Sequence, residues 1–266
     1  MARSMDLGLK ERSALITGAS AGIGRATACS LAGEGARVAM VARGAAGLET
    51  AAASIEEATG LRSLTFPADL SDPGSCDTVI ASAAAELGGL DILVNSVTAP
   101  IWGSFLSHSD EDWEQAMRLK FLTYVRTSRA SLPLLSRSGH GVIINVIGIG
   151  GRMAIKDHLA GGAANAALML LTTGMAKEFA DLKVRVVGVS PGAVRTERFS
   201  TMTQRMNENE PESGAGFEDD LIGSMPTVTI VLPEDVAALV TFLASDRARQ
   251  INGTTITQDG GLMPAV

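Results

Sequence analysis

A short stretch in the second half of the chain carries ionisable side chains directly before a pair of glycines. Lys156, Asp157 and His158 come first, and Gly161 and Gly162 follow at the start of an alanine-rich, apolar run. The pKa of histidine lies close to neutrality, so His158 can serve as an acid whose strength the neighbouring charges tune. A polar loop beside a helix also carries such residues for solubility alone. Both interpretations of His158 stay open.

A second stretch, TGASAGIG at residues 17–24, has the pattern of a phosphate-binding turn. It follows a short apolar run and opens a helical segment, which is the context that such a turn requires. Gly18 permits a tight turn, while Gly22 and Gly24 let the backbone and a ligand approach closely. The helix N-terminus then presents free amide groups and the positive end of its dipole to a diphosphate. We therefore expect a nucleotide at this turn.

The elements that would position these residues alternate regularly along the chain. Runs such as RVAMVAR (37–43) and GVIINVIG (141–148) are almost entirely apolar, as expected for strands covered by helices on both faces. Further strands are expected at 14–16, 63–70, 90–95, 184–192 and 254–261, and helices after the glycine-rich turn and at 44–59, 72–88, 110–137, 163–180 and 233–245. This order predicts an α/β fold: one Rossmann-type domain over residues 1–266, with a doubly wound parallel sheet and helices on both faces.

The segment from 197 to 229 interrupts this alternation, because it is too polar for a core. It is either a lid over a site or an elaborated surface loop, and its position after an expected strand favours the lid.

Composition excludes several classes of protein. The net charge of −7 argues against nucleic acid or an anionic membrane as the main partner. The two cysteines and three histidines match no metal-ligand spacing, so we expect free thiols in a reducing compartment and no metal site. No apolar run approaches ~18 residues and no hydrophobic signal core is visible at the N-terminus, so we expect a cytoplasmic protein that binds no membrane.

These motifs together resemble the short-chain dehydrogenase/reductase family, and the resemblance covers almost the whole chain. Its carriers are the spacing Thr17-Gly18-x-x-x-Gly22-Ile23-Gly24, ADL at 68–70, Asn95 after the fourth strand, SPGAVRT at 190–196 and QDGG at 258–261. The resemblance implies a nicotinamide dinucleotide as cofactor and a small-molecule substrate. The implied cofactor-binding residues are Gly18, Ser20, Gly22, Ile23, Gly24, Arg43, Asp69, Leu70, Asn95, Pro191, Gly192 and Thr196.

The end of the second strand bears on the choice between NADP and NAD. Members that prefer NAD carry an acidic residue there for the ribose hydroxyls, whereas this chain has Ala42 followed by Arg43. A carboxylate repels a 2′-phosphate, but a guanidinium pairs with one and stacks on adenine. We therefore expect NADP (NADPH) to be favoured over NAD. The alternative is that Arg43 is a solvated surface residue.

The catalytic positions that the resemblance implies are occupied by other residues. Family members reduce carbonyl groups with an Asn, Ser, Tyr and Lys set, and the corresponding positions here hold Lys120, Gly148, Gly161 and Asn165. Two of these residues have no side chain, and an asparagine amide cannot tune a pKa as an ammonium does. The only tyrosine, Tyr124, lies four residues beyond Lys120. We expect the usual ketone chemistry to be absent.

Other side chains are candidates for replacing the missing ones. His158 is the candidate proton donor named above. Lys120 either restores a positive charge beneath the nicotinamide ribose or pairs with a carboxylate on the long helix. Trp102, in the loop after the fourth strand, either flanks the substrate or serves only in packing.

Three functional hypotheses follow from these residues. The first is an NADP(H)-binding oxidoreductase with a non-standard active site that reduces an activated C=C bond or a thioester-linked substrate rather than a simple ketone. Such an acceptor needs its acid less stringently, because water can protonate the carbanion. The second is a catalytically inactive nucleotide-binding pseudoenzyme that acts as a sensor or partner subunit, and the third is an inert structural subunit. The resemblance also implies a homo-oligomer, a tetramer or a dimer, and the apolar run at 167–175 suits burial in an interface or in a core.

Overall fold

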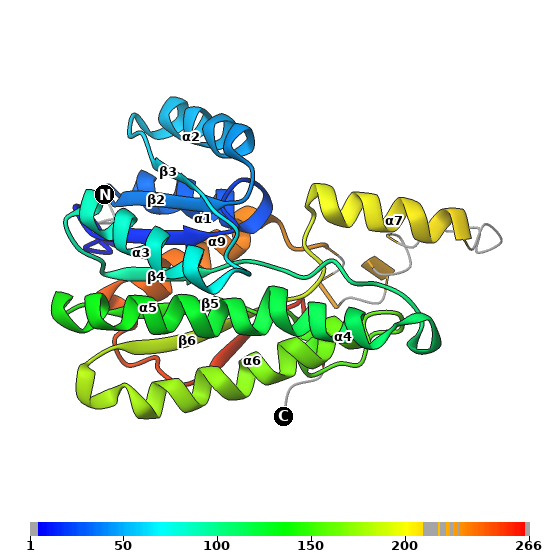
Figure 1. Ribbon diagram of the computed structural model, residues 1–266. Helices are drawn as coiled ribbons and strands as arrows, with labels where there is room; N and C mark the ends of the chain where they lie inside the picture. Colours follow the sequence, from blue (N-terminus) through cyan, green and yellow to red (C-terminus); the bar gives the residue numbers. More distant parts are fainter. Residues whose placement is uncertain (1–4, 210–217, 219–221, 224–225, 228, 264–266) are drawn as a thin grey trace.

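In the part of the chain that the structure describes, seven parallel strands form one sheet in the order β3-β2-β1-β4-β5-β6-β7 (Figure 1). The computed structural model describes residues 5–209, 218, 222–223, 226–227 and 229–263. The strands are β1 (Ser13–Thr17), β2 (Arg37–Ala42), β3 (Leu64–Pro67), β4 (Ile92–Asn95), β5 (Val142–Val146), β6 (Arg185–Pro191) and β7 (Thr255–Gln258). The strand order reverses between β1 and β4, and a crevice at such a reversal is where open α/β sheets bind ligands.

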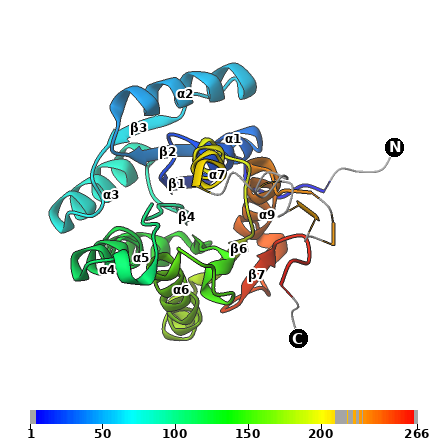
Figure 2. The same ribbon diagram turned by 90° about the vertical axis from the view of Figure 1, so that its right-hand side faces the viewer.

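Helices cover both faces of the sheet, which gives three layers (Figure 2). One face carries α1 (Gly22–Gly33), α2 (Ala45–Thr59) and α9 (Pro233–Ala244), and the other carries α3 (Pro73–Leu87), α5 (Thr123–Ser138) and α6 (Leu159–Glu178). This arrangement confirms the predicted doubly wound fold.

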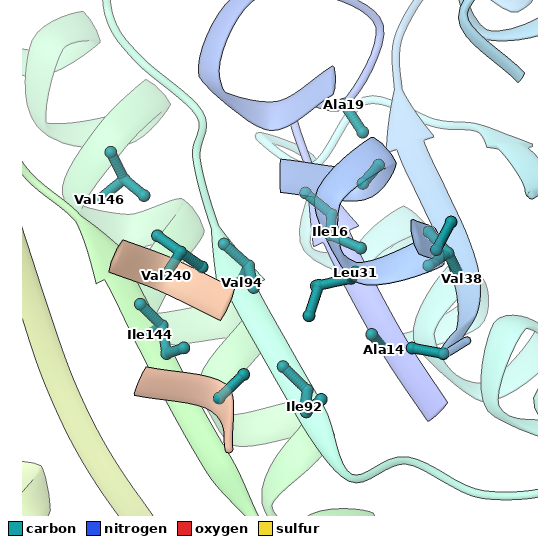
Figure 3. Packing of buried hydrophobic residues seen from close by; sticks show 14 of the residues in the cluster. Ala14, Ile16, Ala19, Leu31, Val38, Ile92, Val94, Ile144, Val146 and Val240 are labelled. Atoms are coloured by element: carbon teal, nitrogen blue, oxygen red, sulfur yellow. The ribbon is translucent and has the colours of Figure 1, made fainter. Parts of the chain in front are cut away.

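Two cores, one on each side of the sheet, explain why the strands are apolar at nearly every position. Ile16 and Val94 point to the α1 and α9 side, where Leu31 and Val240 pack over them (Figure 3). The residues that precede them along the strands, Leu15 and Leu93, pack on the α3 and α5 side. Because successive strand residues face opposite sides, a sheet buried on both faces needs apolar residues at both parities.

The long helix expected over residues 110–137 is interrupted by a wider turn. It forms as α4 (Asp110–Ala116), a π-helical turn η2 (Met117–Leu122) and then α5. Ser109 and Asp112 cap the start of α4, since the Ser109 N–H donates to Asp112 Oδ2 at 2.8 Å and the Asp112 N–H donates to Ser109 Oγ at 3.3 Å. A π-helical turn changes the direction in which side chains leave a helix, and this one carries Lys120.

Helix α6 begins at Leu159, earlier than the expected start at 163, so both glycines of the opening stretch lie inside its first turns. By length and composition alone it is apolar enough to cross a membrane. Its buried residues, among them Leu168, Met175 and Ala176, pack within the fold. Burial in the core accounts for part of the apolar character of α6, while Leu170 on the same helix is 77% exposed.

The polar segment after β6 begins with α7 (Glu197–Asn209), where no helix was predicted. Figure 1 shows α7 beyond the end of the sheet. Phe199 and Thr203 are buried, and Phe199 lines the cavity described below. Most of the remaining segment up to 229, on which the lid was also predicted, lies outside the described residues.

Candidate active site

A cavity of about 1170 Å³ opens at the carboxyl ends of the strands. All of the cofactor-binding residues predicted from the sequence line it except Asn95. Lys120, Gly148, His158 and Asn165 also line it, whereas Gly161 does not. The fold therefore brings the glycine-rich turn and most of the candidate catalytic positions to one space.

At Gly18 and Gly24 the glycine-rich turn is packed so closely that no side chain fits there. A Cβ atom on Gly18, whose φ is +65°, would lie 2.6 Å from the Ser96 carbonyl oxygen, and one on Gly24 would lie 2.3 Å from the Gly18 carbonyl oxygen. Helix α1 then begins without a capping side chain and without an acidic residue in its first turn. Its N-terminal amide groups are free to bind an anion, and the residues present fit a dinucleotide diphosphate.

One end of the cavity carries charged side chains from the ends of β2 and β3. Arg43 is exposed and follows β2 directly. The Ser71 N–H donates to Asp69 Oδ1 at 2.9 Å, and this hydrogen bond holds the pKa of the Asp69 carboxyl below its ordinary value, with a smaller contribution from Arg43. Arg43 is therefore placed to meet a phosphate at this end of the cavity, while the Asp69 carboxylate stays ionised.

Asn95 lies in the interior of the fold. Its Nδ2 donates to Asn145 Oδ1 at 3.0 Å, and its Oδ1 accepts from the Thr127 hydroxyl at 2.7 Å. Asn145 Nδ2 in turn donates to the Thr172 hydroxyl at 3.0 Å. This buried chain of hydrogen bonds ties β4 and β5 to α5 and α6, and it occupies both ends of the Asn95 amide.

Lys120 is the buried cation of the site, with 6% of its surface exposed. Its Nζ donates to the Ile147 carbonyl oxygen at 2.6 Å, and it forms no ion pair with any carboxylate in the described part of the chain. Burial lowers the pKa of Lys120 to about 7, and the positive charge of Arg198 adds to the effect. Of the two interpretations from the sequence, pairing with a helix carboxylate is not observed.

Tyr124 does not reach the cavity. It is fully buried, and its hydroxyl lies 2.7 Å from the Val146 carbonyl oxygen and 3.0 Å from that of Val97. Burial raises the pKa of its phenol well above the ordinary value. This side chain therefore serves the core between β4 and β5.

The space beside Gly161 is filled by the imidazole of His158. A Cβ atom on Gly161 would lie 2.1 Å from His158 Cε1 and 2.6 Å from Nε2. Trp102 stacks on the same ring, with the centroids 4.2 Å apart and the planes at 21°. The His158 Nδ1 atom is buried and has no hydrogen-bond partner among the described residues.

The protonation of His158 follows from this enclosure. Burial lowers its pKa to about 4, the charge of Lys120 acts in the same direction, and a hydrogen bond with the Ile101 backbone opposes both. The imidazole is neutral at pH 7 as a result, and it serves there as a neutral hydrogen-bonding group rather than as a cation.

Asn165 is placed beside two other glycines in the same way. Its Nδ2 lies 3.2 Å from the position of a Cβ on Gly148, whose φ is +127°, and 3.4 Å from that of a Cβ on Gly150. The side chain lines the cavity, the residue is only 4% exposed, and Oδ1 has no partner among the described residues. Burying an amide oxygen without a hydrogen bond is costly, so a ligand that supplies one stabilises this arrangement.

Arg198 also lines the cavity, and the sequence analysis did not identify it. The available signal was a basic residue two positions after Thr196, at the start of the polar segment. Among the described residues no group of three or more His, Cys, Asp or Glu side chains is placed to hold a metal ion.

Comparison with known proteins gives relatives of nearly full length. Residues 18–263 match the family model described as Enoyl-(Acyl carrier protein) reductase. Nodulation protein G of Rhizobium sp. (strain N33) is 33% identical over 257 residues, which are 96% of this chain and 98% of that protein. The 3-oxoacyl-(acyl-carrier-protein) reductase FabG of Escherichia coli (strain K12) is 31% identical over 249 residues, which are 94% of this chain and 96% of that protein.

Among solved structures, L-sorbose reductase from Gluconobacter frateurii, complexed with NADPH and L-sorbose, matches with a TM-score of 0.90 at 30% identity. The match covers 98% of this chain and 100% of that one.

Proposed function

This chain belongs to the short-chain dehydrogenase/reductase family, an oxidoreductase family that binds nicotinamide cofactors, and on this premise we propose that it is an NADP(H)-dependent reductase with a non-standard active site. Its proposed substrates are activated C=C bonds, such as that of an enoyl thioester, rather than simple ketones. The lid over residues 197–229, the single domain over residues 1–266 and the homo-oligomer remain predictions that belong to this proposal.

The preference for NADP rests on Arg43. Ala42 and Arg43 stand at the end of β2, where a carboxylate would bind ribose hydroxyls in an NAD-dependent enzyme, and the guanidinium lines the cavity. The name of the structural neighbour bound to NADPH agrees with this choice. A guanidinium–phosphate pair explains how NADPH would be selected.

The observation that carries the proposal is the His158 ring in the space beside Gly161. A tyrosine at position 161 would collide with this ring, so the acid of the usual tetrad cannot be present while His158 keeps this position. The vacated volume is packed by His158 and Trp102 instead of being left empty. We infer that His158, Asn165 and Lys120 replace the usual residues and that they suit a different acceptor.

In this proposal, the neutral side chains of His158 and Asn165 and the charged side chain of Lys120 have different roles. When bound, the reduced nicotinamide supplies a hydride to the β-carbon of the acceptor. The electron pair of the C=C bond then moves toward the carbonyl oxygen. Asn165 Oδ1 and His158 Nδ1 are unpaired hydrogen-bond acceptors, so each can orient a water molecule whose second O–H donates to this oxygen. The Lys120 ammonium stabilises the negative charge, and its pKa of about 7 suits it to deliver the α-carbon proton through water at neutral pH.

The test is NADPH oxidation by the purified protein with a crotonyl thioester and, separately, with a simple cyclic ketone. We expect turnover of the thioester and little of the ketone. His158→Phe keeps a ring against Trp102 but removes both nitrogens, and it should lower kcat by about 100-fold without changing the NADPH affinity. His140→Phe is the matched control, because His140 is exposed, precedes β5 and does not line the cavity. Its Nδ1 lies 3.3 Å from Asp246 Oδ1. Fast ketone reduction would contradict the proposal.

The alternative is a nucleotide-binding pseudoenzyme that acts as a sensor or partner subunit. It is favoured by the burial of Tyr124 and by the low pKa of His158, because neither group is an effective acid at neutral pH. NADPH binding without oxidation by any activated acceptor would support it. A protein that binds no dinucleotide would instead agree with the inert structural subunit.

A further inference from the structure

Four positive side chains line the cavity, although the protein as a whole carries a net charge of −7. They are Arg43, Lys120, Lys156 and Arg198, and three acidic residues, Asp69, Asp157 and Glu197, line it with them. Arg43 and Arg198 form no hydrogen bond or ion pair with any described residue. Arg198 is exposed, and desolvation by the cavity wall together with repulsion by Arg43 lowers the pKa of its guanidinium. The mutual repulsion of Arg43 and Arg198 is relieved when an anion enters the cavity.

The backbone places Arg198 opposite the glycine-rich turn. Thr196 lies directly across from this turn, since its Cγ2 atom is 3.2 Å from the position of a Cβ on Gly22. The Phe199 N–H donates to the Thr196 hydroxyl at 3.2 Å, which fixes the first turn of α7. Arg198 leaves this turn and lines the cavity, where its charge interacts with those of Arg43 and Lys120.

We propose that Arg198 binds the diphosphate of the dinucleotide from the side facing α7. The inference rests on the proposed function only in requiring that a nicotinamide dinucleotide enters this cavity. The free amide groups at the start of α1 bind the diphosphate from one side, and the guanidinium of Arg198 completes its environment from the other.

The remaining charged groups of this wall support the assignment. Arg43 stands at the end of β2, nearer the ribose and adenine, and Lys120 already donates to the Ile147 carbonyl oxygen. Asp69 accepts from Ser71, Glu197 is exposed beside Arg198, and Lys156 and Asp157 belong to the loop before α6. Arg198 is thus the cation whose donors are free at the level of the turn. Its position on α7 also links cofactor binding to the placement of that helix.

The experiment compares four probes on the full-length protein by calorimetry: NADPH, NADH, ADP and adenosine 2′-phosphate. ADP carries the diphosphate without the 2′-phosphate, and adenosine 2′-phosphate carries the reverse. The variants are Arg198→Gln and Arg43→Gln. Arg195→Gln is the matched control, because Arg195 belongs to the same segment, pairs with Glu218 and does not line the cavity.

We expect Arg198→Gln to weaken NADPH, NADH and ADP alike by about 10- to 100-fold, as expected for the loss of charge-assisted hydrogen bonds, and to leave adenosine 2′-phosphate unchanged. Arg43→Gln should weaken NADPH and adenosine 2′-phosphate while sparing NADH and ADP. Arg195→Gln should match the wild type, and Arg198→Lys should recover part of the loss.

Two results would overturn the assignment. If Arg198→Gln weakens NADPH and adenosine 2′-phosphate only, the residue binds the 2′-phosphate. If it leaves all four affinities unchanged and raises the KM of the thioester, it binds substrate. Failure of the wild type to bind any dinucleotide would refute the proposed function itself, which separates the two conclusions.

Discussion

The two strand-to-helix connections that border the cavity use glycine for opposite reasons. In the connection from β1 to α1, the atoms that a Cβ on Gly18 or Gly24 would meet are backbone carbonyl oxygens at 2.6 and 2.3 Å. In the connection from β5 to α6, the atoms that a Cβ on Gly161 or Gly148 would meet belong to the side chains of His158 and Asn165. The first pair of glycines lets two stretches of backbone approach each other. The second pair leaves room for two polar side chains.

The glycines of the two halves of the site are therefore required for different structural reasons. Backbone atoms cannot move without rebuilding the turn, so the glycines near α1 are required by the geometry of the nucleotide-binding half. A side chain can adopt another rotamer, so Gly161 is required only as long as His158 keeps its place. Gly148 faces the side chain of Asn165, but its φ of +127° also favours glycine. Substitutions in the two halves should therefore have different consequences.

The largest effect is expected for Gly24→Ala. The added methyl group would sit 2.3 Å from the Gly18 carbonyl oxygen, so the turn must open. We expect NADPH affinity to fall by at least about 100-fold and the free energy of unfolding to fall by about 3 kcal/mol. Fluorescence titration and urea unfolding measure the two quantities.

Gly33→Ala is the control on the same helix, because nothing lies within 4 Å of its Cβ position. It should be neutral or slightly stabilising. Wild-type NADPH affinity in Gly24→Ala would show that the packing of the turn is not needed for binding.

Much of the fold could be predicted because burial on both faces of a parallel sheet leaves a direct trace in the strands. Ile16 and Leu15 face different cores, and both are apolar. Helix α7 was missed because its sequence is mostly polar, so the segment from 197 onward was interpreted as a lid or a surface loop. The π-helical turn was missed because one extra residue per turn does not disturb a hydrophobic pattern enough to be seen.

The site was predictable where it depends on chain neighbours and unpredictable where it depends on long-range packing. The order of the glycines identified the turn, and the resemblance to the family placed Gly161 and Asn165 at its tyrosine and lysine positions. No sequence pattern indicates that the ring of His158 turns back over Gly161 to meet Trp102. Asn95 was predicted to face the cofactor, but the position of its amide depends on Asn145, fifty residues away.

The second effect tests the β5–α6 half through the coupling of two residues. Gly161→Ala alone must displace the His158 ring, so we expect a loss of about 1–3 kcal/mol in stability and of about 100-fold in thioester turnover. In a His158→Ala background the same substitution should cost little stability, because the colliding ring is gone. A double-mutant cycle by urea unfolding measures the coupling energy.

NADPH affinity should stay within about threefold of the wild type in all three variants, in contrast to Gly24→Ala. Additive stabilities in the cycle would show that the ring does not occupy the space beside Gly161.

A third, smaller effect is the pH dependence of turnover. Lys120 must be protonated and His158 neutral, so kcat should fall about tenfold per pH unit above about 7, where Lys120 loses its proton, and below about 4, where His158 gains one. Stopped-flow measurement of NADPH oxidation with the crotonyl thioester gives this profile. His158→Phe should lose the acidic limb and keep the alkaline one. If kcat of Lys120→Met still falls above about pH 7, the alkaline limb of the profile belongs to a group other than Lys120.

The smallest expected effect is the change in the free energy of unfolding that the buried charge of Lys120 causes. Burial lowers the pKa of Lys120 from 10.5 to about 7, so between these values the unfolded chain holds a proton that the folded chain does not. Stability should therefore rise with pH from about 7 to 10.5, and the full penalty of the buried charge is present below about 7. Lys120→Met removes this penalty but leaves the Ile147 carbonyl oxygen without its donor. We expect the variant to be more stable than the wild type by about 1–2 kcal/mol at pH 6, with the difference lost or reversed at pH 10.

Urea unfolding at the two pH values measures this change, and Lys177→Met, an exposed lysine of α6, should show no such pH dependence. The sign of the result decides what Lys120 is for. If Lys120 served only packing or its one hydrogen bond, Lys120→Met would lower the free energy of unfolding at both pH values. If Lys120→Met gains stability at pH 6 and loses turnover, the fold keeps a destabilising charge because the substrate half of the site needs it. The nucleotide half relies instead on backbone groups of the glycine-rich turn and needs no buried charge of this kind.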